Sequence, residues 1–218
     1  MKTIALVSVT LNAVNPMMNY LSEQTSEIKL VNYLDSFLLE KIQKDGRISD
    51  ESMGRMFSML TKACTDGADA IILTCTIFSP YVEHMSRMLS VPIICPDGAM
   101  LEMVSKQQGR KAILCTFEGT VETTKSMYQS YCKKNGVNED VDLFSLPDAY
   151  EAARKSDFKR FNQIIRNKVI ELDYKYDHIV LAQISMAPAA NEIETENSKI
   201  YTSPACAYGA VQAVFGQP

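Results

Sequence analysis

The feature that most constrains the fold of this chain is an internal repeat, in which one apolar segment recurs 108 positions later. Asp69-Ala-Ile-Ile-Leu-Thr-Cys75 aligns with Asp177-His-Ile-Val-Leu-Ala-Gln183, and Pro80 aligns with Pro188. Further matches at this offset are Leu6 with Leu114, Ser8 with Thr116, Pro96 with Pro204, and Ala99 with Ala207. Matches at equivalent places along the chain indicate two structurally similar halves. In each half, an apolar segment ends at a turn before a proline.

Short apolar runs alternate with segments of helical spacing along the chain, which is typical of α/β proteins. We expect strands over residues 3–9, 28–34, 70–74, 91–94, 111–115, 142–146, 178–181 and 199–201. The run at 70–74 is apolar almost throughout, as in a parallel strand that is covered on both faces. The sequence therefore predicts an α/β fold of two pseudo-symmetric domains, each a four-stranded, mostly parallel sheet flanked by helices.

Two strand-to-helix connections carry the candidate polar residues. We expect a loop over residues 10–13, followed by a short helix that begins at Asn15-Pro16. We expect a second loop over residues 116–120, followed by a helix that ends near Asn135. After Pro80, a helix is predicted over residues 81–89.

The repeat also suggests domain boundaries. We assign residues 1–96, with Cys75, to the first domain and residues 97–218, with Gln183, to the second. A C-terminal helix over residues 204–215 could pack back on the first domain. In open α/β sheets, ligands bind beyond the carboxyl ends of the strands. We therefore expect Cys75 and Gln183 to face each other across a cleft between the domains, which would be the active site.

Composition and charge narrow the possible partners. The net charge of -4, the pI near 5.3 and the absence of a Lys/Arg cluster argue against binding to nucleic acid or to a membrane, and favour a small molecule. Six cysteines without a CxxC pair, together with only two histidines, predict no metal site and indicate reduced thiols in a cytoplasmic protein. No apolar run approaches the roughly 18 residues of a membrane-spanning helix. No dinucleotide or P-loop motif occurs.

The segment Ala70-Ile-Ile-Leu-Thr-Cys75-Thr76, together with Ile179-Val-Leu-Ala-Gln183 and the loop from Thr116 to Thr120, resembles the aspartate/glutamate/hydantoin racemase superfamily. The resemblance covers nearly the whole chain. It implies two α/β halves, a small carboxylate substrate, no cofactor and a homodimer. It also implies that Cys75 acts as an acid, a base or a nucleophile.

Several polar residues are candidates for binding the substrate. The resemblance implies that Thr76, Thr116 and Ser185 hold a substrate carboxylate. Hydroxyl and backbone N–H groups at strand-to-helix turns can converge on an anion, and the full candidate set is Thr10, Asn12, Thr76, Thr116, Glu118, Gly119, Thr120 and Ser185. Ser and Thr at such positions also cap helices, so both interpretations stay open. Glu118 could repel a carboxylate or bind an amino group.

Gln183 departs from the pattern of a two-cysteine racemase, because it stands where the second thiol would be. Racemisation by two bases requires one group to remove the α-proton and another to deliver a proton to the opposite face, and a neutral amide does neither. Cys75 would itself need a lowered pKa, which the N-terminus of the following helix could supply. Alternatively, Cys75 is a buried structural thiol.

Three functions therefore remain open from the sequence. The first is a cofactor-independent isomerase of the racemase superfamily that acts on a small carboxylate through Cys75. The second is a single-thiol decarboxylase or a maleate-type cis-trans isomerase. The third is a protein that binds a carboxylate without turnover.

Overall fold

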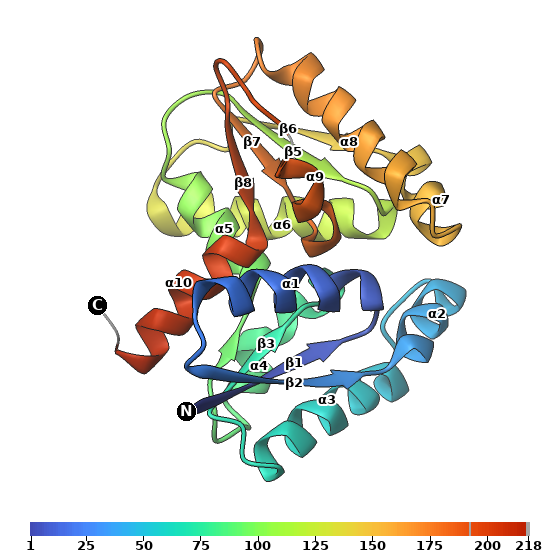
Figure 1. Ribbon diagram of the computed structural model, residues 1–218, viewed down its shortest axis with the longest axis vertical. Coiled ribbons are helices and arrows are strands. Elements are labelled where there is room, and N and C mark those ends of the chain that lie inside the picture. Colours follow the sequence, from blue (N-terminus) through green and yellow to red (C-terminus); the bar gives the residue numbers. More distant parts are fainter. Residues whose placement is uncertain (192, 217–218) are drawn as a thin grey trace. The chain divides into compact units, whose positions relative to one another are not determined.

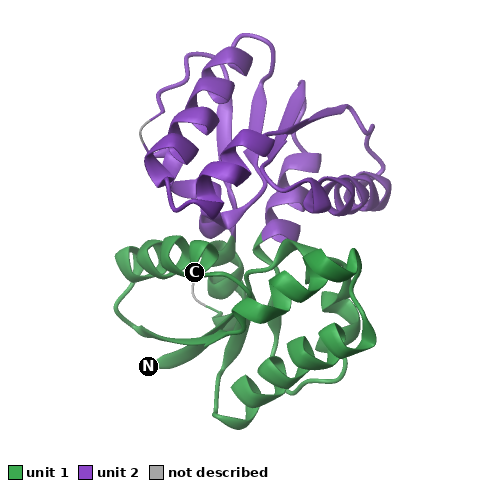
Figure 2. Ribbon diagram, turned by 90° about the vertical axis from the view of Figure 1, so that its right-hand side faces the viewer, with its two compact units in different colours: residues 1–96, 207–218 green, residues 97–206 purple. Residues whose placement is uncertain are grey.

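The computed structural model describes residues 1–191 and 193–216, which form two compact units (Figures 1 and 2). Residues 1–96 and the C-terminal segment from Ala207 belong to the first unit, drawn in green in Figure 2, and Asp97–Cys206 form the second, drawn in purple. The last helix, α10 (Ser203–Phe215), therefore contributes residues to both units.

The sheet of the first unit has the strand order β2-β1-β3-β4, and all neighbouring strands are parallel. Its strands are β1 (Lys2–Ser8), β2 (Ile28–Leu34), β3 (Ala70–Leu73) and β4 (Ile93–Ile94). The helical segments are α1 (Leu11–Gln24), α2 (Ser36–Asp45), α3 (Asp50–Thr65), the 3-10 helix η1 (Thr76–Tyr81) and α4 (Val82–Ser86). β3 is buried along its whole length, which explains its continuous apolar run.

The second unit repeats this arrangement with the order β6-β5-β7-β8, again entirely parallel. Its strands are β5 (Lys111–Cys115), β6 (Val141–Ser145), β7 (His178–Leu181) and β8 (Lys199–Thr202). The helical segments before α10 are α5 (Pro96–Ser105), α6 (Glu118–Asn135), α7 (Pro147–Arg154), α8 (Phe158–Leu172), the 3-10 helix η2 (Ile184–Met186) and α9 (Ala187–Ala190). The predicted α/β class with two four-stranded parallel sheets is confirmed.

Strand pairing shows that the repeat is not offset by 108 residues throughout. Val7 pairs with Leu73 in the first sheet, and Leu114 pairs with Leu181 in the second. Leu73 and Leu181 are 108 residues apart, whereas Val7 and Leu114 are 107 apart. The predicted match of β3 with β7 is therefore correct, and the predicted match of the first strands is wrong by one residue.

The fourth strands show the same one-residue difference. Ile71 pairs with Ile93, and its equivalent Ile179 pairs with Ile200, which again gives an offset of 107. The sequence matches that this register corrects by one residue are Leu6 with Leu114, Ser8 with Thr116, Pro96 with Pro204, and Ala99 with Ala207.

Each sheet has an aspartate that makes the same kind of contact. Oδ2 of Asp69 accepts the backbone N–H of Thr3 at 2.8 Å, and Oδ2 of Asp177 accepts the backbone N–H of Arg110 at 2.7 Å. In both cases, the carboxylate satisfies an N–H near the start of a central strand: Thr3 is the second residue of β1, and Arg110 directly precedes β5. The repeated Asp in the sequence thus reflects a repeated structural contact.

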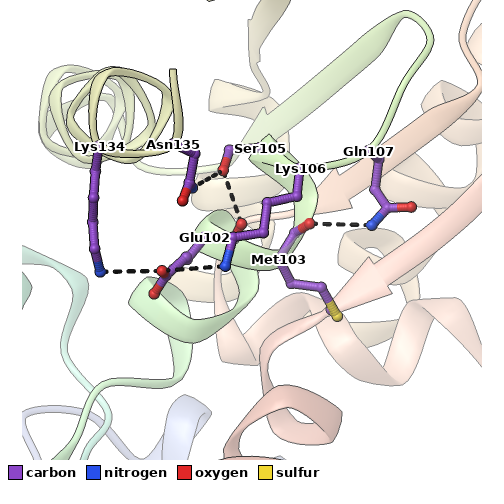
Figure 3. Close-up of polar contacts among 7 residues, drawn as sticks. All are labelled: Glu102, Met103, Ser105, Lys106, Gln107, Lys134 and Asn135. Carbon is purple, nitrogen blue, oxygen red and sulfur yellow. Dashed lines mark hydrogen bonds and ion pairs between the residues drawn. The ribbon is translucent and has the colours of Figure 1, made fainter. Parts of the chain in front are cut away.

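A polar cluster joins the C-terminal ends of α5 and α6 (Figure 3). Asn135 Nδ2 donates to Ser105 Oγ at 3.0 Å, and Ser105 Oγ donates to the carbonyl of Glu102 at 2.8 Å. The Glu102 carboxylate pairs with Lys134 at 3.1 Å and with Lys106 at 3.4 Å. Hydrogen bonding to Lys134 is the main reason that the pKa of Glu102 lies below its usual value.

Two predicted loops are shorter than expected, and one helix was not predicted. Residues 11–13 are helical, because Thr10 caps α1 and the helix continues past Pro16. The loop over 116–120 consists of Thr116 and Phe117 only, since α6 begins at Glu118. Helix α7 was not predicted, although Pro147 at its first position is a typical start signal.

In the part of the chain that the structure describes, no helix is both long enough and apolar enough to span a membrane.

Candidate active site

Cys75 lies at the carboxyl edge of the first sheet, two residues after the end of β3. Its side chain is buried, with an exposed fraction of 5%. Its backbone carbonyl accepts hydrogen bonds from the N–H of Phe78 at 3.1 Å and from the hydroxyl of Ser79 at 3.4 Å. The strand on one side and the 3-10 turn on the other thus hold Cys75 at the edge where open α/β sheets bind ligands.

The helical segment after Cys75 differs from the predicted helix over residues 81–89. A six-residue 3-10 helix begins directly at Thr76, and the α-helix that follows, α4, has only five residues. A helix dipole grows with the number of aligned peptide units, and its N-terminal effect depends on N–H groups without intrahelical partners. Here the first turn of η1, rather than a long α-helix, is next to the thiol.

Thr10, Asn12 and Thr76 lie along the same edge of the first sheet, because β1 and β3 are neighbouring strands. The hydroxyl of Thr10 accepts the N–H of Asn12 at 3.3 Å, so Thr10 has a clear capping role. Asn12 is half-buried in the first turn of α1, and Thr76 is buried directly after the thiol. A contact of these three side chains with a substrate stays a prediction.

Sequence reasoning missed two buried hydroxyls beside Cys75. Oγ of Ser8, the last residue of β1, lies 2.7 Å from Oγ1 of Thr74. Thr74 also donates to the carbonyl of Val7 at 3.3 Å. Both could have been identified from the sequence, because each is a polar residue at the end of an apolar strand. Together they tie the end of β3 to β1 immediately before the thiol.

Gln183 holds the equivalent position in the second sheet. It follows the end of β7 by two residues and precedes the 3-10 helix η2, as Cys75 precedes η1. Oε1 of Gln183 accepts both the backbone N–H of Thr116 at 2.6 Å and the hydroxyl of Thr116 at 2.7 Å. Because β5 and β7 are neighbours, the structure brings these two candidate residues together at the carboxyl edge of their sheet.

The other candidates of the second unit lie in the turns after β5 and β7. The buried hydroxyl of Thr120 donates to the carbonyl of Phe117 at 2.6 Å, which is a structural contact at the start of α6. Glu118 and Gly119 are exposed in the first turn of this helix. A Cβ atom at Gly119 would lie 2.6 Å from the Phe117 ring, so any larger residue here requires the ring to move. Ser185 is half-buried in η2.

Two other thiols have environments that keep them protonated at neutral pH. Burial raises the pKa of Cys115 to about 11, and burial together with the charge of Asp97 raises the pKa of Cys206 to about 11. All six cysteines are free thiols. Among the described residues, no group of three or more His, Cys, Asp or Glu side chains is placed to hold a metal ion.

Comparison with known proteins relates this arrangement to one family. The family model described as Asp/Glu/Hydantoin racemase matches residues 6–208. The structure is similar to aspartate racemase from Picrophilus torridus, with 13% identity and a TM-score of 0.76, over 99% of this chain and 95% of that one.

Two further solved structures show the same fold. Allantoin racemase from Klebsiella pneumoniae is 13% identical with a TM-score of 0.70, over 99% of this chain and 88% of that one. Glutamate racemase isoform RacE1 from Bacillus anthracis is 14% identical with a TM-score of 0.69, over 99% of this chain and 83% of that one. No curated protein matches this chain.

Proposed function

Because the chain belongs to the Asp/Glu/hydantoin racemase family and is thus an enzyme of the isomerase type, we propose that it acts on a small carboxylate through a single catalytic thiol, that of Cys75. The observation that carries this proposal is the asymmetry between the two sheets. A thiol stands at the carboxyl edge of the first sheet, and an amide stands at the equivalent place in the second. That both residues act on one substrate stays a prediction from the sequence, as does a homodimer.

One thiol supports proton transfer on one face of a carbon atom. As a thiolate, Cys75 removes the proton from the carbon next to a carboxylate; as a thiol, it returns a proton to the carbanion. Donors near the carboxylate stabilise the negative charge that builds up on its oxygens, and removal of one such donor typically costs about 3–4 kcal/mol in the transition state. Thr76 and the first turn of η1 are the nearest candidate donors along the chain.

A second candidate function follows from the amide of Gln183. A substrate that loses CO2 leaves a carbanion, which takes a proton from the Cys75 thiol; the resulting thiolate then regains a proton from water. This sequence needs only one acid and no second base, so it suits a single-thiol decarboxylase. Addition of the thiolate to an alkene, rotation and elimination would give a cis-trans isomerase with the same single thiol.

The test is a set of incubations in D2O followed by NMR. The compounds are amino acids of both hands, hydantoins, maleate and malonates, and the readouts are deuterium at the α-carbon, release of CO2 and alkene geometry. Inversion supports a racemase, exchange with retention supports one-face proton transfer, and CO2 or fumarate supports the second candidate. Binding without turnover would support a non-catalytic carboxylate-binding protein.

The matched variants are Cys75→Ala and Cys64→Ala, of which the second removes a half-buried thiol in the last turn of α3. We expect Cys75→Ala to abolish the activity found and Cys64→Ala to leave it unchanged. Full activity of Cys75→Ala would show that the thiol has no catalytic role.

A further inference from the structure

The contacts of Gln183 fix which end of its amide faces Thr116. A glutamine amide has an oxygen that accepts and a nitrogen that donates, whereas a backbone N–H can only donate. The atom 2.6 Å from the backbone nitrogen of Thr116 must therefore be Oε1. The hydroxyl of Thr116 reaches the same oxygen at 2.7 Å. It follows that Nε2, with its two N–H groups, is directed away from Thr116.

These contacts change the role expected for Thr116. Its side chain is buried, and both of its donors, the backbone N–H and the hydroxyl, are directed at Gln183. While these bonds exist, neither donor can bind a substrate carboxylate as the sequence comparison suggested. Thr116 instead fixes the orientation of a neighbouring side chain.

Nε2 of Gln183 is a donor that the rest of the unit does not use. Gln183 is half-buried at the carboxyl edge of β7, and within the described residues no group accepts a hydrogen bond from Nε2. A donor that is held rigidly at this edge stabilises negative charge without reorganising, whereas it has no attraction for an ammonium group. The chemistry that fits it is an anionic oxygen.

We propose that Thr116 is a positioning residue, which holds the Gln183 amide so that Nε2 donates to an anionic oxygen of the substrate. The inference rests on the proposed function, since it assumes that the substrate carries a carboxylate. In this arrangement, Gln183 binds and orients an anionic group and transfers no proton. The amide thus replaces a second acid or base with a fixed hydrogen-bond donor.

The decisive variant is Gln183→Glu, because a carboxylate accepts the same two hydrogen bonds from Thr116 but places an oxygen where Nε2 stands. Binding is measured by NMR titration with malonate, succinate, and both enantiomers of aspartate and glutamate. We expect the variant to bind the tightest of these probes about 10- to 100-fold more weakly at pH 7.5, as for loss of a hydrogen bond to a charged group. Affinity should return towards pH 5, as the introduced carboxyl group gains a proton that it can donate.

Thr116→Val and Thr116→Ser test the positioning role. Valine keeps the branched shape and the backbone N–H but lacks the hydroxyl, so the side-chain amide signals of Gln183 should show greater motion in nitrogen-15 relaxation. Binding of the same probe should fall about 2- to 10-fold, as for loss of a neutral hydrogen bond. Serine restores the hydroxyl, and it should restore both the amide order and the affinity.

Three results would overturn the inference: wild-type protein that binds none of the probes, equal affinity of Gln183→Glu at pH 7.5, or amide signals that Thr116→Val leaves unchanged. If Gln183→Glu does not fold, the comparison of Thr116→Val with Thr116→Ser still tests the inference. Wild-type protein that binds a probe through Gln183 but never exchanges its α-proton would refute the proposed activity and leave the binding role intact.

Discussion

Gly109 and Asp177 are so close together that a side chain at Gly109 would collide with the Asp177 side chain. A Cβ atom built on Gly109 would lie 2.7 Å from Oδ2 of Asp177, and the backbone at Gly109 has a φ of +100°. The carboxylate is held there because it accepts the N–H of Arg110 at 2.7 Å. The contact that starts the central strand of the second sheet therefore depends on a glycine next to it.

We expect Gly109→Ala to be much more destabilising than Gly67→Ala. Gly67 has a similar φ of +89° but no heavy atom within 4 Å of its Cβ position, so its substitution tests backbone strain alone. Strain of this kind costs about 1–3 kcal/mol, and the clash with Asp177 adds about 1–3 kcal/mol. Urea denaturation of both variants measures the difference. Equal losses of unfolding free energy would show that Asp177 moves aside without cost.

The Ser8–Thr74 pair predicts non-additive substitutions. Because Thr74 donates to the carbonyl of Val7, its oxygen is the acceptor for the buried Ser8 hydroxyl. Thr74→Val keeps the shape but leaves the Ser8 hydroxyl without this partner, at a cost of about 1–3 kcal/mol. In the double variant Thr74→Val with Ser8→Ala, no unpaired hydroxyl remains, so the loss should be smaller than the sum of the single losses. Strict additivity in a double-mutant cycle would exclude this hydrogen bond.

Asp173 should make folding stability depend on pH. Burial by itself would raise the pKa of Asp173, but its carboxylate accepts the N–H groups of Glu196, Asn197 and Ser198, and the net effect is a pKa below the reference value of 3.8. A pKa lower in the folded than in the unfolded state stabilises the fold above the unfolded pKa, and this contribution is lost as the pH falls through the folded pKa.

The variant that tests this is Asp173→Asn. Its unfolding free energy should lie below that of the wild type at pH 7, and the gap should narrow as the pH falls below 4. Denaturation curves at several pH values measure the gap. A gap that stays constant over this range would mean that the carboxylate charge contributes nothing.

Cys206 should react slowly with alkylating reagents at neutral pH. Its pKa of about 11 reflects burial first and the negative charge of Asp97 second. Since the thiolate is the reactive form, the alkylation rate by iodoacetamide should rise about tenfold for each pH unit from 7 to 10. Asp97→Asn removes the charge and should raise the rate at a given pH. The rate is measured by mass spectrometry of the peptide that contains Cys206. A rate that levels off below pH 9 would contradict the raised pKa.

Much of the fold follows from local pattern. The strands at 28–34, 111–115 and 178–181 have the predicted bounds. The last two are largely apolar runs, whereas residues 28–34 mix apolar residues with Lys29 and Asn32 between the acidic residues Glu27 and Asp35. The start of α1 could not be placed this way, since Pro16 suggested a first helical turn where the chain is already helical. The cap at Thr10 was the competing signal, and it determines where the helix begins.

The candidate site was predictable only in part. The position of Cys75 at the end of a buried strand follows from the sequence. The bonds from Thr116 to Gln183 do not, because they join two strands that are 67 positions apart in the chain. A repeat aligned at one constant offset also cannot reveal where a residue was gained or lost. Strand pairing supplies that information.

The change in offset along the repeat determines how a strand of one sheet must be aligned when it replaces the equivalent strand of the other. Relative to the first unit, the second has one residue more between β5 and β7 and one fewer between β7 and β8. Both changes fall in connecting segments, where they leave the strand faces intact. A hybrid in which β5 replaces β1 must therefore be joined at an offset of 107. A junction at 108 would turn every inward-facing side chain of the grafted strand to the opposite face.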